Sequence, residues 1–168
     1  MQSSKPEFER INFKQLVPGA YQAMLALESY VHQTGLEPSL LQLVKMRASQ
    51  INGCAYCLDM HSKDARAAGE TEQRLHLLPA WRETPFYSDR ERAALAWTEA
   101  VTLLSETHVP DDVYHFARQR FSNEELVNLT IAIVAINGWN RLEVSFRGVA
   151  GSYKPARGPR EENGSKIA

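Results

Sequence analysis

The chain has 168 residues, of which 43% are hydrophobic and 23% are charged, a composition typical of an ordinary folded domain that excludes disordered, collagen-like and coiled-coil chains. Its 19 basic and 20 acidic residues leave a net charge of -1 without a run of Lys or Arg, so neither nucleic acid nor a membrane surface is expected as a partner. The longest apolar run, 131–136, is too short to cross a bilayer, and the first residues lack a signal-peptide core. We therefore expect a cytoplasmic protein.

Helical periodicity divides the first half of the chain into four segments. Apolar residues recur at helical spacing over 18–31 and 37–52, and Gly53 has the position of a residue that ends the second helix. A third helix is expected over 54–68, because Gly69 can end this helix and Thr71 can begin the next one. A shorter helix is expected over 71–81.

Two capping boxes begin the long helices of the second half. Ser88 and Ser122 each stand three positions before a glutamate, and an apolar helical pattern follows both. The first helix is expected to reach about residue 105, and a helix over 110–121 comes next. The second is apolar on several faces, so we expect it at the centre of the fold. The β-branched run 131–136 could suggest a strand, but no partner segment exists to form a sheet.

The sequence thus predicts an all-α, single-domain helical bundle over residues 1–151. Gly138 interrupts its last helix at a cost of about 1 kcal/mol relative to alanine, which indicates a close helix contact or a kink, unless the glycine is merely tolerated. Residues 152–168 contain two Pro, two Gly and almost no large apolar side chain. We expect this tail to be mobile or draped over a partner subunit.

The only two cysteines lie in the run Cys54-Ala-Tyr-Cys57-Leu-Asp-Met-His61, at the start of the third predicted helix. At about 100° per residue, Cys57 lies about 60° and His61 about 20° from Cys54, so the three share one helix face. Unpaired N–H groups and the helix dipole favour a thiolate at Cys54. His61 is a potential base for Cys57, one turn earlier. Such a pair can attack a peroxide with one thiolate and form a disulfide with the other.

Other uses of this motif stay open. Zinc could be bound by Cys54, Cys57 and His61, but a structural site needs a fourth ligand, and no second C-x-x-C or H-x-x-x-H follows. A c-type haem requires a histidine directly after the second cysteine, and a thioredoxin motif requires a βαβ pattern. The cysteines could also be inert core residues. We favour the redox interpretation and expect neither a metal nor a cofactor.

The run 40–70, LLQLVKMRASQINGCAYCLDMHSKDARAAGE, resembles the core signature of the AhpD-like, or carboxymuconolactone decarboxylase, family, in particular its alkylhydroperoxidase-type members. The resemblance extends more loosely over 20–151. It implies an all-α fold that assembles as trimers or hexamers. It also implies that Cys54 and Cys57 are the reactive pair, with His61 as their partner. The implied activity is hydroperoxide reduction in antioxidant defence, with a thiol or dithiol reductant such as a lipoylated or thioredoxin-like protein.

Two positions depart from the family pattern. The glutamate that often stands twelve residues before the first cysteine is replaced by Gln42, whose amide can neither take nor give a proton. Gln42 could orient His61 or a water molecule, or it could be a polar residue on an exposed helix face. Tyr56 occupies a position where some members have histidine, and we expect it to pack or to line the pocket. Trp139 and Asn140 are further candidates for the pocket lining.

We therefore predict a thiol peroxidase in which Cys57, paired with His61, attacks the hydroperoxide and Cys54 resolves the product. One alternative is a decarboxylase acting on a small lactone acid, although that chemistry needs a proton shuttle and an anion site rather than two thiols. The other is a non-catalytic redox sensor or zinc-held module. A homo-oligomer is expected, because the helices over 18–31 and 123–146 have more apolar faces than a small monomer covers.

Overall fold

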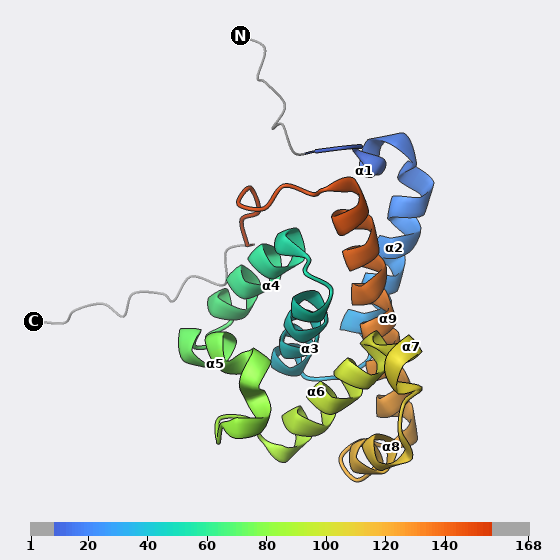
Figure 1. Cartoon of the computed structure of the whole chain (residues 1–168). Helices are drawn as coiled ribbons and strands as arrows, with labels where there is room; N and C mark the ends of the chain where they lie inside the picture. Colours follow the sequence, from blue (N-terminus) through green and yellow to red (C-terminus); the bar gives the residue numbers. More distant parts are fainter. Residues whose placement is uncertain (1–8, 156–168) are drawn as a thin grey trace, which may run out of the picture.

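A computed structural model describes residues 9–155, and every regular element in this range is a helix. The predicted all-α fold class is confirmed. Figure 1 shows the helices gathered around α3. No helix in the described range is long and apolar enough to span a membrane. The elements in chain order are α1 (Phe13–Leu16), α2 (Pro18–His32), α3 (Pro38–Ile51), α4 (Ala55–Ala67), α5 (Glu72–Leu77), the 3-10 helix η1 (Leu78–Glu83), α6 (Asp89–Thr102), α7 (Leu104–Thr107), α8 (Asp111–Arg118) and α9 (Asn123–Phe146).

Local capping signals fix where the long helices begin. The Ser88 hydroxyl accepts a hydrogen bond from the Glu91 N–H, and the Glu91 carboxylate accepts one from the Ser88 N–H. Ser122 and Glu125 form the same capping box at the start of α9. Gly53 follows α3 with φ +65°, a left-handed conformation that glycine adopts without strain, so α4 can begin at once in a new direction.

Helix ends differ more from the predictions. The segment predicted as one helix over 71–81 divides into α5 and η1, because Pro79 cannot donate a helical hydrogen bond and Ala80 leaves the helical region at φ -111°, ψ 27°. The helix predicted to reach about residue 105 ends at Thr102, and α7 follows as a separate turn. The short helix α1 was not predicted, since four residues show no periodicity.

The centre of the bundle is shared by two helices. Helix α3 packs against α4, α6 and α9, and most of its residues are buried. Helix α9 packs against α2, α3, α4, α6 and α8, but its outer face leaves Val127 and Val134 exposed. Helix α9 therefore has the central position predicted for it but shares that position with α3, and one of its faces remains exposed.

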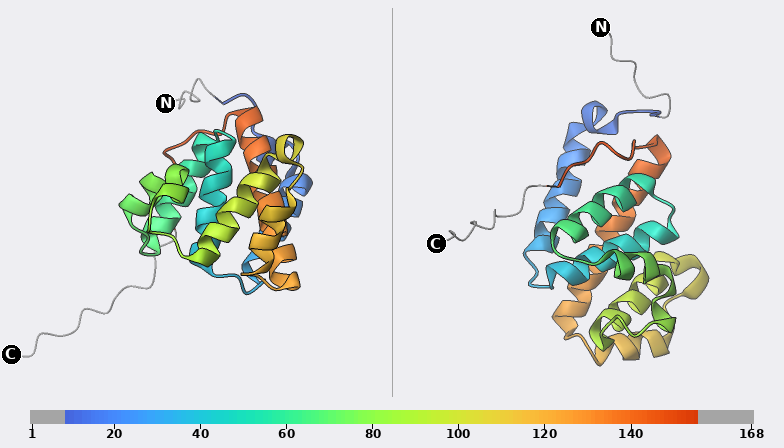
Figure 2. Two further views of the ribbon diagram at one scale, coloured as in Figure 1. Left: turned by 60° about the horizontal axis from the view of Figure 1, so that its bottom comes forward. Right: turned by 90° about the vertical axis from the view of Figure 1, so that its left-hand side faces the viewer.

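Helix α2 lies close against α9, as Figure 2 shows. A Cβ atom on Gly138 would lie 2.8 Å from Met24 Cε, so the glycine permits this close approach. The Tyr30 hydroxyl donates to Asn128 Oδ1 at 2.9 Å and adds a polar contact between the same two helices. Of the interpretations of Gly138, a close helix contact is therefore the one that the structure supports.

The chain after α9 turns back over α4. The Tyr153 hydroxyl donates to Asp64 Oδ1 at 2.7 Å, and Lys63 Nζ donates to the Tyr153 carbonyl at 3.0 Å. The first residues of the predicted tail, 152–155, thus lie against α4 of the same chain. The prediction for the remainder, 156–168, lies outside the described residues.

Candidate active site

The cysteine pair lies at the N-terminus of α4. Cys54 is the N-cap residue with extended backbone, and its Sγ accepts a hydrogen bond from the Cys57 N–H at 3.4 Å. Both side chains are buried free thiols. The N-cap position predicted for Cys54 therefore brings a backbone N–H to its sulfur, where the positive end of the helix dipole also acts.

The two thiols have opposite electrostatic properties. A hydrogen bond from the Cys57 side chain lowers the pKa of Cys54, although burial opposes this change. The same contact, together with burial, raises the pKa of Cys57. Two sulfurs this close lose their protons as a coupled pair, in which the first negative charge suppresses the second ionisation. The reduced pair can thus hold one negative charge, and transfer of the remaining proton moves that charge from one sulfur to the other.

His61 is held in one orientation by Gln42. Its Nδ1 lies 3.1 Å from Gln42 Oε1, which joins α4 to α3. An amide oxygen only accepts hydrogen bonds, so this contact assigns the ring proton to Nδ1 and leaves Nε2 as an acceptor. Burial, aided by the charge of Lys45, lowers the pKa of His61 to about 3, so the imidazole is neutral at neutral pH. Of the two roles considered for Gln42, orientation of His61 agrees with this geometry.

A cavity of about 260 Å³, here called the thiol cavity, opens onto Cys57. The sequence-predicted residues in its wall are Gln42, Tyr56, Cys57, His61 and Trp139. Cys54 and Asn140 are absent from the wall. Apolar contacts come from Tyr21, Leu25 and Met60. An incoming molecule would therefore meet Cys57 before Cys54.

Asn140 lies behind the cysteines rather than in the cavity wall. Its Nδ2 donates to Ser49 Oγ at 3.0 Å, and its Oδ1 accepts from Asn52 Nδ2 at 2.9 Å. A hydrogen bond with the Asn140 side chain also lowers the pKa of Cys54. Asn140 thus supports the cysteine pair from α9.

Two ion pairs in the cavity wall were not predicted. Lys14 Nζ lies 2.9 Å from Glu143 Oε1, and the buried Lys45 pairs with Glu28. Glu143 could have been found, because it stands three residues after Asn140 and shares its helix face. Lys14 belongs to the short α1, where no periodic pattern exists to place it.

The zinc alternative finds no support in the site. Within residues 9–155, no group of three or more His, Cys, Asp or Glu side chains has a geometry that could hold a metal ion. Cys54, Cys57 and His61 therefore do not form the ligand set that this alternative requires. The His61 Nδ1 is already engaged by Gln42.

Sequence comparison relates the chain to known proteins. The sequence profile of the carboxymuconolactone decarboxylase family matches residues 18–100, which include the cysteine motif. The uncharacterized protein YdfG of Bacillus subtilis is 41% identical over 144 residues, which cover 86% of this chain and 98% of YdfG. The chain belongs to the carboxymuconolactone decarboxylase family.

Solved structures of similar fold agree with this membership. A protein of unknown function from Agrobacterium tumefaciens, suggested to be the antioxidant defence protein AhpD, is 48% identical with a TM-score of 0.84, over 86% of this chain and 99% of its own. The debrominase Bmp8 is 20% identical with a TM-score of 0.72, over 80% of this chain and 73% of its own, and shares the fold. The predicted resemblance to AhpD-like members of the carboxymuconolactone decarboxylase family is confirmed.

Proposed function

We propose that the protein is a thiol-dependent peroxidase that reduces hydroperoxides through Cys54 and Cys57. The observation that carries this proposal is the coupled thiol pair, of which only Cys57 faces the thiol cavity. The apolar part of the cavity wall suits the organic part of a hydroperoxide. Family membership and the similarity to a suggested antioxidant protein support the same activity.

In the first step, Cys57 becomes the nucleophile. Its proton passes to the Cys54 thiolate, because burial keeps the pKa of His61, one helical turn away, too low for its Nε2 to hold that proton. The Cys57 thiolate then attacks the terminal oxygen of the hydroperoxide. A sulfur–oxygen bond forms and the O–O bond breaks, so that the sulfur is oxidised to a sulfenic acid and the peroxide is reduced to an alkoxide. The alkoxide takes up a proton and leaves as the alcohol.

In the second step, Cys54 resolves the sulfenic acid. The Cys54 sulfur attacks the Cys57 sulfur, a disulfide forms, and the hydroxyl group leaves as water together with the proton that Cys54 received in the first step. Starting from the singly charged pair, one hydroperoxide and one proton yield the disulfide, one alcohol and one water. A dithiol reductant, such as a lipoylated or thioredoxin-like protein, returns the disulfide to two thiols by exchange.

The test is turnover with a defined reductant. Reduced protein is mixed with cumene hydroperoxide and dihydrolipoamide, and alcohol formation is followed. We expect one alcohol per dihydrolipoamide consumed and no activity in Cys57→Ser. Turnover that persists in Cys57→Ser would contradict the proposal, as would an intact wild-type protein without turnover with any organic hydroperoxide or dithiol.

The decarboxylase alternative gains nothing from the cavity. A small lactone acid carries a carboxylate, which a free cation in the wall would hold. The lysines there, Lys14 and Lys45, are each paired with a glutamate. We therefore retain the peroxidase as the proposed function.

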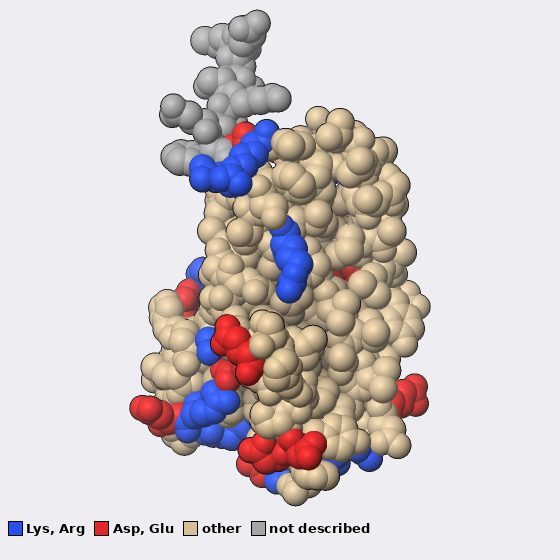
Figure 3. All heavy atoms as spheres, turned by 45° about the vertical axis from the view of Figure 1, so that its right-hand side comes forward, with Lys and Arg blue, Asp and Glu red and all other residues tan. Residues whose placement is uncertain are grey.

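We also propose that the protein is a homo-oligomer, as trimers or hexamers. Figure 3 shows a face on which charged side chains are sparse over the upper and right-hand parts. Exposed apolar residues on the outer helices include Tyr30 of α2, Leu104 of α7, and Val127 and Val134 of α9. A second copy of the chain would bury these side chains. Light scattering at micromolar concentration should give a multiple of 19.0 kDa, and a purely monomeric species would contradict the proposal.

A further inference from the structure

The ion pair between Lys14 and Glu143 is fixed from several sides. Glu143 is 5% exposed, and a Cβ atom on Gly148 would collide with its Oε2, so the carboxylate is seated against the backbone. The Lys14 ammonium lies 2.9 Å from Glu143 Oε1 and 4.7 Å from the centre of the Tyr56 ring. The chain thus holds one ammonium group in a defined place at the edge of the thiol cavity.

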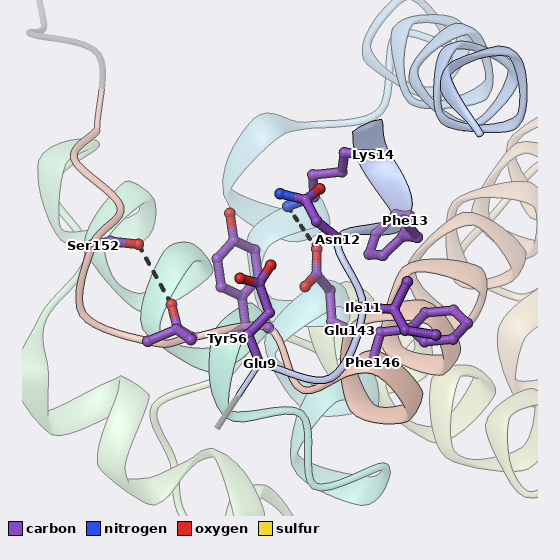
Figure 4. Close-up of a pocket in the computed structure, with 11 residues that line it drawn as sticks. Glu9, Ile11, Asn12, Phe13, Lys14, Tyr56, Glu143, Phe146 and Ser152 are labelled. Carbon is purple, nitrogen blue, oxygen red and sulfur yellow. Dashed lines mark hydrogen bonds and ion pairs between the residues drawn. The ribbon is translucent and has the colours of Figure 1, made fainter. Parts of the chain in front are cut away.

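This pair separates two cavities. A second cavity of about 290 Å³, here called the outer cavity, has exposed residues such as Glu9 and Ser152 at its rim. Lys14, Tyr56 and Glu143 are the residues common to the walls of the outer and thiol cavities. Figure 4 shows Lys14 and Glu143 directed toward each other beside Tyr56. A proton held on Lys14 can therefore be replaced from the outer cavity.

The proposed reaction needs a proton at this place. Oxidation of the singly charged thiol pair consumes one proton from outside the pair, and an alkoxide is a poor leaving group until it is protonated. His61 cannot hold such a proton in the resting enzyme, because its pKa is lowered to about 3 by burial. The thiol cavity therefore requires another donor.

We propose that Lys14 is the general acid that protonates the alkoxide leaving the hydroperoxide, and that Glu143 positions it. This inference rests on the peroxidase function proposed above. As the O–O bond breaks, a proton moves from Lys14 Nζ to the departing oxygen, which leaves as the alcohol. The resulting neutral amine regains a proton from water in the outer cavity. The positive charge of Lys14 also stabilises the developing negative oxygen.

The electrostatics agree with a resident ammonium. Burial alone would lower the pKa of Lys14, but the hydrogen bond to Glu143 and its charge outweigh burial and raise the pKa. Lys14 is therefore protonated at neutral pH. An alkoxide is a much stronger base than an amine, since even bulk water has a pKa of about 15.7, so proton transfer to the alkoxide is still favourable.

Lys45, the other lysine of the thiol cavity, is less suited to this role. Its side chain is 2% exposed and pairs with Glu28, and it does not line the outer cavity. A proton given up by Lys45 would have no comparable route of replacement. Lys14, with a side chain that is 33% exposed, has one.

The experiment compares leaving groups. Second-order rate constants are measured for reduced wild type, Lys14→Met and Lys14→Arg with tert-butyl hydroperoxide, which releases an alkoxide, and with peracetic acid, which releases acetate and needs no proton donor. Peroxide concentrations are kept where the rate is proportional to them, so that the attack step is measured. Alkylation by iodoacetamide reports thiolate reactivity without any leaving oxygen. Lys63→Met is the matched control, because Lys63 pairs with Asp59 but lines neither cavity.

We expect Lys14→Met to slow the reaction with tert-butyl hydroperoxide about 100-fold. Its rates with peracetic acid and iodoacetamide should stay within about threefold of wild type. Lys14→Arg keeps a charge beside Glu143 but does not release a proton, so it should also be slow with tert-butyl hydroperoxide. The Lys63→Met variant should react like wild type with all three reagents.

Three outcomes would overturn the role of Lys14. An equal loss with both peroxides in Lys14→Met would indicate a structural or thiolate effect. Full activity of Lys14→Arg would indicate that charge alone is needed, and unchanged rates in both variants would remove the role altogether. If wild type reacts with neither peroxide, the peroxidase function itself fails, which is a different result from selective loss in the variants.

Discussion

Replacing Gln42 by glutamate tests how the neutral His61 limits thiolate formation. In the present chain, Gln42 Oε1 accepts the Nδ1 proton of His61 at 3.1 Å but carries no charge. A carboxylate at the same place favours the imidazolium, which in turn stabilises a thiolate at Cys57. Gln42→Glu should therefore raise the pKa of His61, lower the pH at which the thiol reacts, and increase the peroxidase rate.

The magnitude follows from the contact. An opposite charge within hydrogen-bonding distance would raise the pKa of His61 from its present value of about 3 to roughly 4 to 6. The imidazole would still be mostly neutral at pH 7, so the gain is partial. We expect an increase in rate on the order of tenfold, at the lower end of general acid–base effects.

The assay is the rate of iodoacetamide alkylation as a function of pH, followed in parallel with hydroperoxide turnover. Gln50→Glu serves as the matched control, because it adds the same charge to α3 without lining the thiol cavity. Its alkylation profile should coincide with that of wild type. The reasoning is refuted if Gln42→Glu leaves both the alkylation profile and the turnover rate unchanged.

Three further predictions concern the same site. Cys57→Ser should abolish peroxide reduction. Cys54→Ser should form one sulfenic acid, which dimedone traps, and should show no further turnover. A sulfenic acid that is trapped only in Cys57→Ser would reverse the two roles. The pKa of His61 is depressed from 6.5 to about 3 in the folded state, so its contribution to the free energy of unfolding should be fully present above pH 6.5 and decline as the pH falls toward 3. Urea titrations should show a loss of about 2 kcal/mol between pH 7 and 5. An equal decline in His61→Asn would exclude His61 as the cause. Gly148→Ala should displace the Glu143 carboxylate and slow tert-butyl hydroperoxide reduction but not iodoacetamide alkylation, and equal rates for wild type and variant would contradict the positioning role of Glu143.

Features encoded within a few neighbouring residues could be predicted from the sequence. The capping boxes at Ser88 and Ser122 give the starts of α6 and α9, because their hydrogen bonds join residues three positions apart. Cys54 could be placed at a helix N-terminus for the same reason, since Gly53 ends the preceding helix. The end of α5 was harder, because the effect of Pro79 competes with a continuing apolar pattern.

Features that depend on packing between distant segments could not be predicted. The contact between Gln42 and His61 joins α3 and α4, and spacing alone left the orientation of Gln42 undecided. Lys14 and Glu143 come from opposite ends of the described chain, and they meet where the Phe13 ring of α1 contacts the Phe146 ring at the end of α9. Sequence spacing therefore indicates the candidate reactive thiols, whereas the arrangement of the polar groups around them can be seen only in the fold.

The peroxidase claim is tested most directly by the mass of the cysteine peptide after a single oxidation. Reduced protein is treated with one equivalent of cumene hydroperoxide, blocked with iodoacetamide and digested with trypsin, which releases residues 48–63 with both cysteines in one peptide. The account predicts that this peptide loses two hydrogen atoms in mass, gains no blocking group, and appears together with one equivalent of cumyl alcohol. A peptide that carries two blocking groups after exposure to the hydroperoxide, with the hydroperoxide unconsumed, would contradict it.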